Sequence, residues 1–213
     1  MCRLLAAKAK SPFAVEGYLR RLAAVARSSK EYQGHGWGCA LLDDAGAWAL
    51  HRSITPIWED DLTRWGRTRL LIAHARSAFR NEGIVVENNM PFCDGRNAFA
   101  FNGELRGVRI RQPGRIGAEK IFNLIRRFHR GDPAAAVERA TGILRQRTDF
   151  IRAMNIVISD GETVCVSSLF NDDPDYFTMH HQAGPDGFVV CSEPLDAGGD
   201  WRPIDNDTIR VLT

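Results

Sequence analysis

The stretch NIVISDGETVCV, residues 155–166, consists of two apolar segments on either side of the turn residues Ser159-Asp160-Gly161-Glu162. An Asp-Gly pair tolerates the positive φ angles of a tight turn, and β-branched residues favour extended backbone, so this stretch predicts a β-hairpin. Two further pairs of apolar segments are separated by turn residues: 36–42 with 47–51, and 176–181 with 188–191. Apolar segments at 70–73 and 98–101 predict additional strands.

Amphipathic helices are predicted between the strands. Ser11 and Pro12 suit the N-cap and first turn of a helix, and apolar residues at helical spacing follow to about Ser28. Residues 118–130 and 133–147 have the same spacing, and Asp132-Pro133 begins the second of these helices. Because the helices are segregated from the hairpins, the sequence favours a layered α+β fold over a doubly wound sheet, in a single domain that spans residues 1–213.

Composition and charge exclude several classes of function. With 44 % hydrophobic residues, 25 % charged residues and a net charge of +2, the chain indicates neither a nucleic-acid nor a membrane partner. The sequence contains no segment long and apolar enough to cross a bilayer and no signal peptide, so a cytoplasmic location is expected. The five cysteines are scattered without a Cys-x-x-Cys pair, and no phosphate-binding loop or metal-ligand spacing is present, so no cofactor is expected.

Cys2 follows the initiator Met1 directly. Removal of Met1 would leave a residue that carries both a thiol and a free α-amine. An α-amine has a pKa of about 7.7 to 8.0, so it can accept the thiol proton near neutral pH, directly or through one water. A cysteine at position two is by itself weak evidence for a nucleophile, and its interpretation depends on other residues. A retained Met1 would convert the amine into an amide and remove the base.

Several other segments combine glycine, arginine and amide side chains in a particular order: His35-Gly36-Trp37-Gly38, His74-Ala75-Arg76-Ser77-Ala78, Asn88-Asn89-Met90-Pro91-Phe92, Phe101-Asn102-Gly103-Glu104 and Ser192-Glu193-Pro194-Leu195. Together with Met1-Cys2-Arg3-Leu4-Leu5-Ala6, they resemble the class II glutamine amidotransferase family, including its stand-alone amidohydrolase members. The matches run from residue 2 to about residue 195 in the order of the family. Most are weak individually, and jointly they are specific.

The resemblance implies a four-layer αββα sandwich of two antiparallel sheets, the N-terminal nucleophile hydrolase fold. It implies that Cys2 attacks the side-chain amide of glutamine or a γ-glutamyl amide and forms a thioester. Asn102 and Gly103 would stabilise the oxyanion, and Arg76 would bind the substrate α-carboxylate through paired hydrogen bonds. Gly36 and Gly38 would allow close backbone approach around Trp37, which we assign to the substrate site with an ordinary core aromatic as the alternative. His74 is interpreted as structural.

The sequence departs from the family pattern at positions that would face the substrate. Phe79 replaces a threonine, Phe101 replaces the histidine before Asn-Gly, and Asn89-Met90 replaces Thr-His. The aspartate that holds the substrate α-ammonium aligns with Gly117. Because a buried ammonium needs a carboxylate partner, either Glu104 or Glu119 substitutes, or the substrate is not a free α-amino acid.

Three alternative functions follow from the same residues. The chain could be a glutaminase subunit that delivers ammonia to a synthase on a separate chain, which would be its partner. It could be an amidase of another N-terminal cysteine family, such as the bile-salt and penicillin hydrolases, although the Arg76, Asn-Gly and Ser-Glu-Pro-Leu matches argue against this. The third alternative is a catalytically silent binding or scaffold protein that retains the fold.

Overall fold

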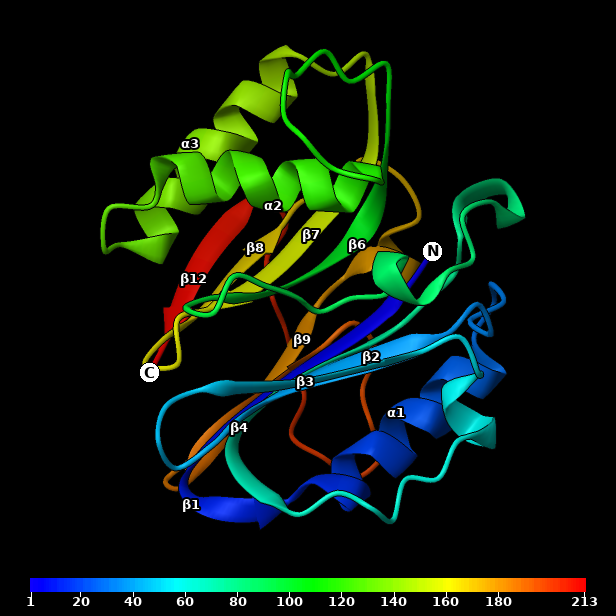
Figure 1. The fold of residues 1–213 in the computed structure, drawn as a ribbon, viewed down its shortest axis with the longest axis vertical. Helices are drawn as coiled ribbons and strands as arrows, with labels where there is room; N and C mark the ends of the chain where they lie inside the picture. Colours follow the sequence, from blue (N-terminus) through cyan, green and yellow to red (C-terminus); the bar gives the residue numbers. More distant parts are fainter.

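Two antiparallel sheets face each other in the computed structural model, which describes residues 1–213 (Figure 1). The larger sheet has the strand order β11-β9-β10-β1-β4-β2-β3. Its strands have these bounds: β1 Arg3–Ala14, β2 Trp37–Leu42, β3 Trp48–Ser53, β4 Arg67–Ala75, β9 His180–Gly184, β10 Gly187–Cys191 and β11 Arg202–Pro203. The smaller sheet has the order β12-β8-β7-β6-β5. Its strands have these bounds: β5 Phe92–Cys93, β6 Ala98–Arg106, β7 Phe150–Ser159, β8 Val164–Ser168 and β12 Thr208–Leu212.

Helices cover the outer face of each sheet (Figure 1). Helix α1, Val15–Ser28, lies on the larger sheet, whereas α2, Gly117–Phe128, and α3, Pro133–Gln146, lie on the smaller one. A short helix and three 3-10 turns lie in the connections: α4 Pro174–Phe177, η1 Ile57–Glu59, η2 Phe79–Asn81 and η3 Val86–Asn88. No helix is both long enough and apolar enough to span a membrane.

Alternation along the strands divides the core into layers. In β1, Leu4 and Ala6 pack in the cluster between the two sheets, whereas Leu5 packs in the cluster beneath α1. In β4, Leu70 and Ile72 belong to the inter-sheet cluster. Successive strand residues point to opposite faces, so a residue two positions before Leu4 points to the same side of the sheet as Leu4. Cys2 at the start of β1 is therefore directed between the sheets.

The α+β class and the αββα layering predicted from the sequence are confirmed, as are the β7–β8 hairpin and the helix that begins at Pro133. Asp132 caps that helix by accepting hydrogen bonds from the backbone N–H groups of Ala134 and Ala135 at 2.9 and 3.1 Å.

Two local predictions are wrong. Ser11 and Pro12 belong to β1, because Phe13 and Ala14 pair with β4 beyond a register shift, so α1 begins only at Val15.

The segment 176–181 is the second error. Tyr176 and Phe177 end helix α4 and are buried side chains of a small cluster, and the strand β9 begins only at His180. Pro174 at the first helical position favours the helix, and the burial of both rings fixes it in place. Tertiary packing here prevails over the β propensity of the aromatic residues.

Candidate active site

Cys2 lies immediately before β1 and contacts the segment that follows β4. Its side chain is buried, and its Sγ accepts a hydrogen bond from the Ser77 backbone N–H at 3.4 Å and lies 3.6 Å from the Ser77 carbonyl oxygen. Burial raises the pKa of the Cys2 thiol above its ordinary value, while the positive N-terminal amine, the Ser77 N–H and Arg76 act in the opposite direction. The thiol is therefore protonated at neutral pH and needs a base to become a nucleophile.

Arg76 is a buried cation without an acidic partner. Its side chain is only 5 % exposed, and its one hydrogen bond runs from Nη1 to Oδ1 of Asn89 at 3.2 Å. Asn89 is itself anchored by a 2.6 Å hydrogen bond from Nδ2 to the Ser53 carbonyl oxygen. No carboxylate lies within ion-pair distance of the guanidinium, so its remaining donors are available to an anionic group that enters the site.

Asn102 is a buried amide without hydrogen-bond partners. It lies on β6, is fully buried, and points into the inter-sheet layer because Ala98 and Ala100 of the same strand do so. Neither Oδ1 nor Nδ2 of Asn102 has a partner in the protein. Buried polar groups of this kind are uncommon, and one beside a cavity is a candidate for ligand binding. The next residue, Gly103, has room for no side chain, because a Cβ would lie 2.1 Å from the Ala153 carbonyl oxygen.

A cavity of about 530 Å³ brings most of the predicted site residues together. Cys2, Arg76, Phe79, Gly103 and Gly117 all line it, although they come from the start of β1, the end of β4, the strand β6 and the first turn of α2. Asn102 lies behind the lining, between Phe101 and Gly103, which both reach the cavity. The volume is in the range of sites that enclose small organic ligands.

Comparisons with known proteins agree with this architecture. No family model matches the chain. The γ-glutamyl-hercynylcysteine sulfoxide hydrolase of Mycolicibacterium smegmatis is 29 % identical over 178 residues, which cover 79 % of this chain and 73 % of that protein. A glutamine aminotransferase class-II domain protein from Silicibacter pomeroyi superposes with a TM-score of 0.69 at 20 % identity, covering 99 % of this chain and 94 % of the other.

The glutamine phosphoribosylpyrophosphate amidotransferase of Bacillus subtilis has the same TM-score, 0.69, at 16 % identity. The match covers 99 % of this chain and 47 % of the larger enzyme. This chain has the class II glutamine amidotransferase fold. It spans about half the length of the Bacillus subtilis protein and nearly the full length of the Silicibacter pomeroyi protein.

Within this amidotransferase fold, no nearby carboxylate simply replaces the aspartate that the family pattern has at the position of Gly117. Glu119 accepts hydrogen bonds from the side chain and the backbone N–H of Arg115, and it does not line the cavity. Glu104 does line the cavity, but its carboxylate pairs with Arg106 and lies 3.7 Å from Arg152. The sequence prediction missed Glu82, which lines the cavity and forms no ion pair or side-chain hydrogen bond. Its position five residues before Glu87 in a loop carries no signal of this placement.

Phe79 stands at the rim of the cavity with 54 % of its surface exposed. It begins the 3-10 turn η2, in which Arg80 has a positive φ of 54° and places its guanidinium 5.1 Å from the Phe79 ring centroid. The aromatic side chain is thus accessible to a ligand from the solvent side, as its assignment to the substrate site requires.

Trp37 is the one predicted site residue that the structure places elsewhere. Its side chain is fully buried beneath α1, donates a 2.8 Å hydrogen bond from Nε1 to Asp60, and packs against His51 and Trp65. The physical reason is alternation along β2, which directs Gly38 to the inter-sheet layer and Trp37 to the opposite face. The assignment of Trp37 to the substrate site is corrected accordingly, and Trp37 is a core aromatic.

His35 fixes the segment that contacts Cys2, whereas the ring of His74 forms no hydrogen bond. The His35 backbone N–H donates to the Arg76 carbonyl oxygen at 3.1 Å, and its Nδ1 accepts from the Ala78 N–H at 2.9 Å. His74 is fully buried between the sheets with neither ring nitrogen hydrogen-bonded, and burial together with the Arg76 charge lowers its pKa to about 3. The role of His35 was missed, although the His-Gly-Trp-Gly segment was noted, because its partner is 41 to 43 residues away.

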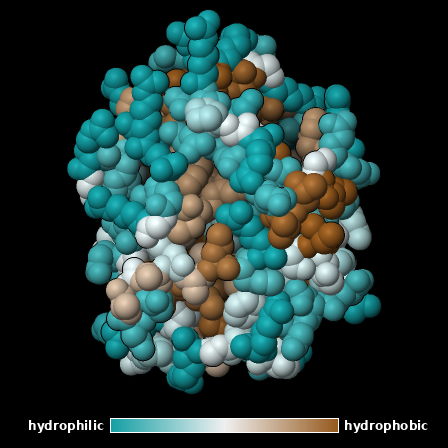
Figure 2. Space-filling model, in the orientation of Figure 1, coloured by the Kyte–Doolittle hydropathy of each residue, from teal (hydrophilic) through white to brown (hydrophobic).

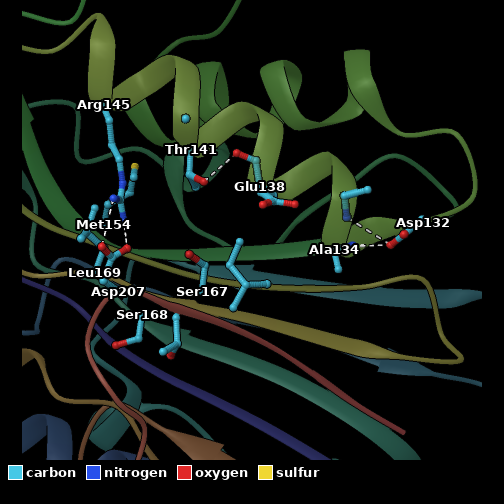
Figure 3. A pocket seen from close by; sticks show the side chains of 14 residues that line it. Asp132, Ala134, Glu138, Thr141, Arg145, Met154, Ser167, Ser168, Leu169 and Asp207 are labelled. Atoms are coloured by element: carbon cyan, nitrogen blue, oxygen red, sulfur yellow. Dashed lines mark hydrogen bonds and ion pairs between the residues drawn. The ribbon is translucent and has the colours of Figure 1, made fainter.

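A second cavity of about 630 Å³ lies between α3 and the strands β8 and β12 (Figure 3). Most of its charged side chains already have partners, since Asp132 caps α3 and Arg145 pairs with Asp207, and only the Glu138 carboxylate has none. Ser168 has an unpaired hydroxyl, but alternation along β8 directs it into the inter-sheet layer with Val166. No group of three or more His, Cys, Asp or Glu side chains is arranged to hold a metal ion. The cavity at Cys2 is the candidate active site because it joins the Cys2 thiol to the acid-free guanidinium of Arg76.

Proposed function

We propose that this chain is an amidohydrolase that uses Cys2, as its mature N-terminal residue, to cleave the side-chain amide of glutamine or a γ-glutamyl amide. The observation that carries the proposal is the shared cavity of the Cys2 thiol and the buried, acid-free guanidinium of Arg76. A nucleophile beside a carboxylate-binding cation suits an acyl substrate whose other end is anionic. The printed name of the Mycolicibacterium smegmatis relative, a γ-glutamyl hydrolase, supports the same substrate class.

The proposed reaction begins after removal of Met1. The Cys2 α-amine accepts the thiol proton, and Sγ attacks the amide carbon to form a tetrahedral oxyanion. The unpaired Nδ2 of Asn102 and the backbone N–H of Gly103 donate to that oxyanion. The C–N bond then breaks, the amine leaves with the proton from the Cys2 amine, and a thioester remains. Water attacks the thioester, releases the carboxylic acid and restores the thiol.

The N-terminal peptide is held in a way that suits this chemistry. The Met1 amino group pairs with Glu31, and Arg152 also pairs with Glu31 at 3.1 Å. Arg3 donates to the carbonyl oxygens of Tyr176 and Ser192, both at 3.3 Å, and thereby fixes the residue next to the nucleophile. All five cysteines are free thiols, which supports the proposed cytoplasmic location.

The test combines intact mass with activity on the purified full chain. A mass that lacks Met1 shows that the α-amine is available, and release of ammonia or amine from glutamine and γ-glutamyl amides measures hydrolysis. An electrophilic glutamine analogue is expected to add once per chain at Cys2. Cys2→Ala should abolish both labelling and hydrolysis, whereas Cys39→Ala, which alters a buried thiol under α1, should retain them. Full hydrolysis by Cys2→Ala would contradict the proposal, and ammonia release that requires an added synthase would favour a glutaminase subunit.

A further inference from the structure

Apolar side chains form much of the wall of the cavity at Cys2. They come from the β4–β5 connection (residues 76–91), from β6, from the β6–α2 connection (residues 107–116) and from α2. Among them are Phe79 of the first connection and Val108 and Ile110 of the second. Phe79 and Val108 are 54 % and 38 % exposed. Large apolar side chains that remain exposed at the mouth of a cavity mark a surface that a ligand covers.

The apolar character extends outward along the β4–β5 connection. Ile84, Val85 and Val86 are each more than a third exposed. Figure 2 shows apolar atoms gathered in a patch on the right of this face, on the side where Figure 1 places the connection that follows β4. The cavity therefore opens beside an apolar surface, whereas hydrophilic residues cover most of the rest of this face.

The acyl half of the proposed substrate occupies little of this space. Cys2 Sγ contacts the backbone of Ser77, the residue directly after Arg76, so the nucleophile and the carboxylate-binding cation lie close together. In the proposed reaction the γ-glutamyl group lies between these two side chains. The leaving nitrogen, on the other side of the attacked carbon, would then face the remainder of the 530 Å³ cavity. Free glutamine, which releases only ammonia, would leave that part of the cavity unfilled.

The charged side chains of the lining do not favour one sign of charge in the leaving group. Arg115 is paired with Glu119, and Glu104 is paired with Arg106. Glu82 and Lys120 form no ion pair and carry opposite charges. Apolar contact is thus the interaction that the lining as a whole can make with a leaving group.

We propose that Phe79, Val108 and Ile110 form a leaving-group subsite, which selects γ-glutamyl amides whose amine carries a bulky apolar, preferably aromatic, group. This inference rests on the proposed amidohydrolase function and narrows its substrate. The subsite takes no part in bond breaking, since the amide C–N bond is cleaved at Cys2 and the apolar amine is released whole. Burying an aromatic group against this wall should raise kcat/KM by about 10- to 100-fold.

The test uses substrates with the same γ-glutamyl half: glutamine, γ-glutamylethylamide, γ-glutamylphenethylamide and γ-glutamylglycine. Ethylamine and phenethylamine have similar basicity, so their amides differ mainly in the apolar contact of the leaving group. With the processed full chain, kcat/KM for the phenethylamide should exceed that for the ethylamide and for glutamine by at least tenfold. Preference for γ-glutamylglycine would assign the subsite to an anionic leaving group and overturn the inference.

Variants locate the preference on the chain. Phe79→Ser and Val108→Ser should each lower the ratio of phenethylamide to ethylamide kcat/KM several-fold, and Val211→Ser should not. Val211 is a matched control because it is an exposed valine, 48 % accessible, on β12 away from this cavity. An unchanged ratio in the Phe79 and Val108 variants would overturn the subsite. Equal hydrolysis of all four substrates would overturn the inference and leave the amidohydrolase function intact, whereas hydrolysis of none would overturn both.

Discussion

The hydroxyl of Tyr176 donates a 2.6 Å hydrogen bond to the carbonyl oxygen of Met1, across 175 residues of sequence. Gln33 donates from Nε2 to the same oxygen at 2.5 Å and to the Tyr176 hydroxyl at 3.0 Å. Both side chains are buried, and Oε1 of Gln33 has no partner. Removal of Met1 would take that carbonyl away and place the new Cys2 α-amine beside Gln33 and Tyr176.

Tyr176→Phe is therefore expected to lower kcat several-fold with little change in KM. In the processed chain the Tyr176 hydroxyl, which accepts from Gln33 Nε2 at 3.0 Å, would lie beside the Cys2 α-amine. Loss of a buried hydrogen bond to that amine would cost about 1 kcal/mol and loosen the proposed nucleophile and base. Steady-state kinetics on γ-glutamyl amides measure the effect. Tyr18→Phe is the control, since the Tyr18 hydroxyl forms no hydrogen bond. An equal fall in both variants would contradict the assignment.

Arg76→Lys should raise KM for γ-glutamyl substrates by about 10- to 100-fold while kcat falls less. Lysine keeps the charge but loses the planar pair of donors that matches a carboxylate. The measurement is the full kinetic profile, compared with Arg69→Lys, which alters an exposed arginine on β4, the strand that Arg76 directly follows. If Arg76→Lys binds substrate normally, Arg76 is not the carboxylate-binding group.

Asn102 and Asn155 lie directly opposite each other in the β6–β7 register and form a matched pair. Asn155 donates to the Phe177 carbonyl oxygen at 2.7 Å and accepts from the Leu169 N–H at 3.0 Å, whereas the Asn102 amide has no partner. Asn102→Ala should cost about a hundredfold or more in kcat with little loss of stability. Asn155→Ala should lower the free energy of unfolding by about 2 kcal/mol, because it leaves buried backbone groups unpaired.

Urea unfolding and kcat measured on both variants separate the two roles. A large stability loss in Asn102→Ala without a disproportionate loss of kcat would show that the amide is structural.

His74 should make stability depend on pH. Burial, followed by the Arg76 charge, lowers its pKa from the ordinary value of 6.5 to about 3 in the folded protein. The unfolded chain then binds a proton below pH 6.5 that the folded chain refuses, so stability is lost as pH falls from 6.5 toward 3. Between pH 6.5 and pH 4, the original chain should lose about 3 kcal/mol more than His74→Gln. If the free energy of unfolding of the two proteins, measured in urea, fell equally with pH, His74 would not be a neutral, buried side chain.

Gly117→Asp restores the acid that the family pattern has at the start of α2. A Cβ at Gly117 meets no atom within 4 Å, and an acidic residue in the first turn of a helix is stabilising by about 0.3 to 1 kcal/mol. We expect KM for free glutamine to fall several-fold, because the new carboxylate can pair with the substrate ammonium. Gly117→Asn, which has the same size without the charge, should leave KM unchanged. Equal KM values for both variants would show that Gly117 does not face the α-ammonium.

Local features of the sequence determined most of the fold. The turn at Asp160-Gly161 and the apolar segments beside it specify the β7–β8 hairpin, because the interactions that form it lie within a few residues. Likewise, Asp132-Pro133 specifies the start of α3 through contacts within one helical turn. The sequence also allowed Cys2, Arg76 and Asn102-Gly103 to be proposed as site residues, because each stands in a short segment that resembles a known family.

Only the tertiary structure decided which of these side chains share a cavity. Trp37 belongs to a segment that resembles the family, yet the alternation of β2 against its neighbours buries it under α1. Tyr176 and Met1 meet only because α4 packs against the start of β1, and no local pattern reports a contact across 175 residues. The apolar wall that joins Phe79 to Val108 has the same origin. Short-range propensities set the strands and helices, whereas the packing of the two sheets decides which side chains meet in the candidate site.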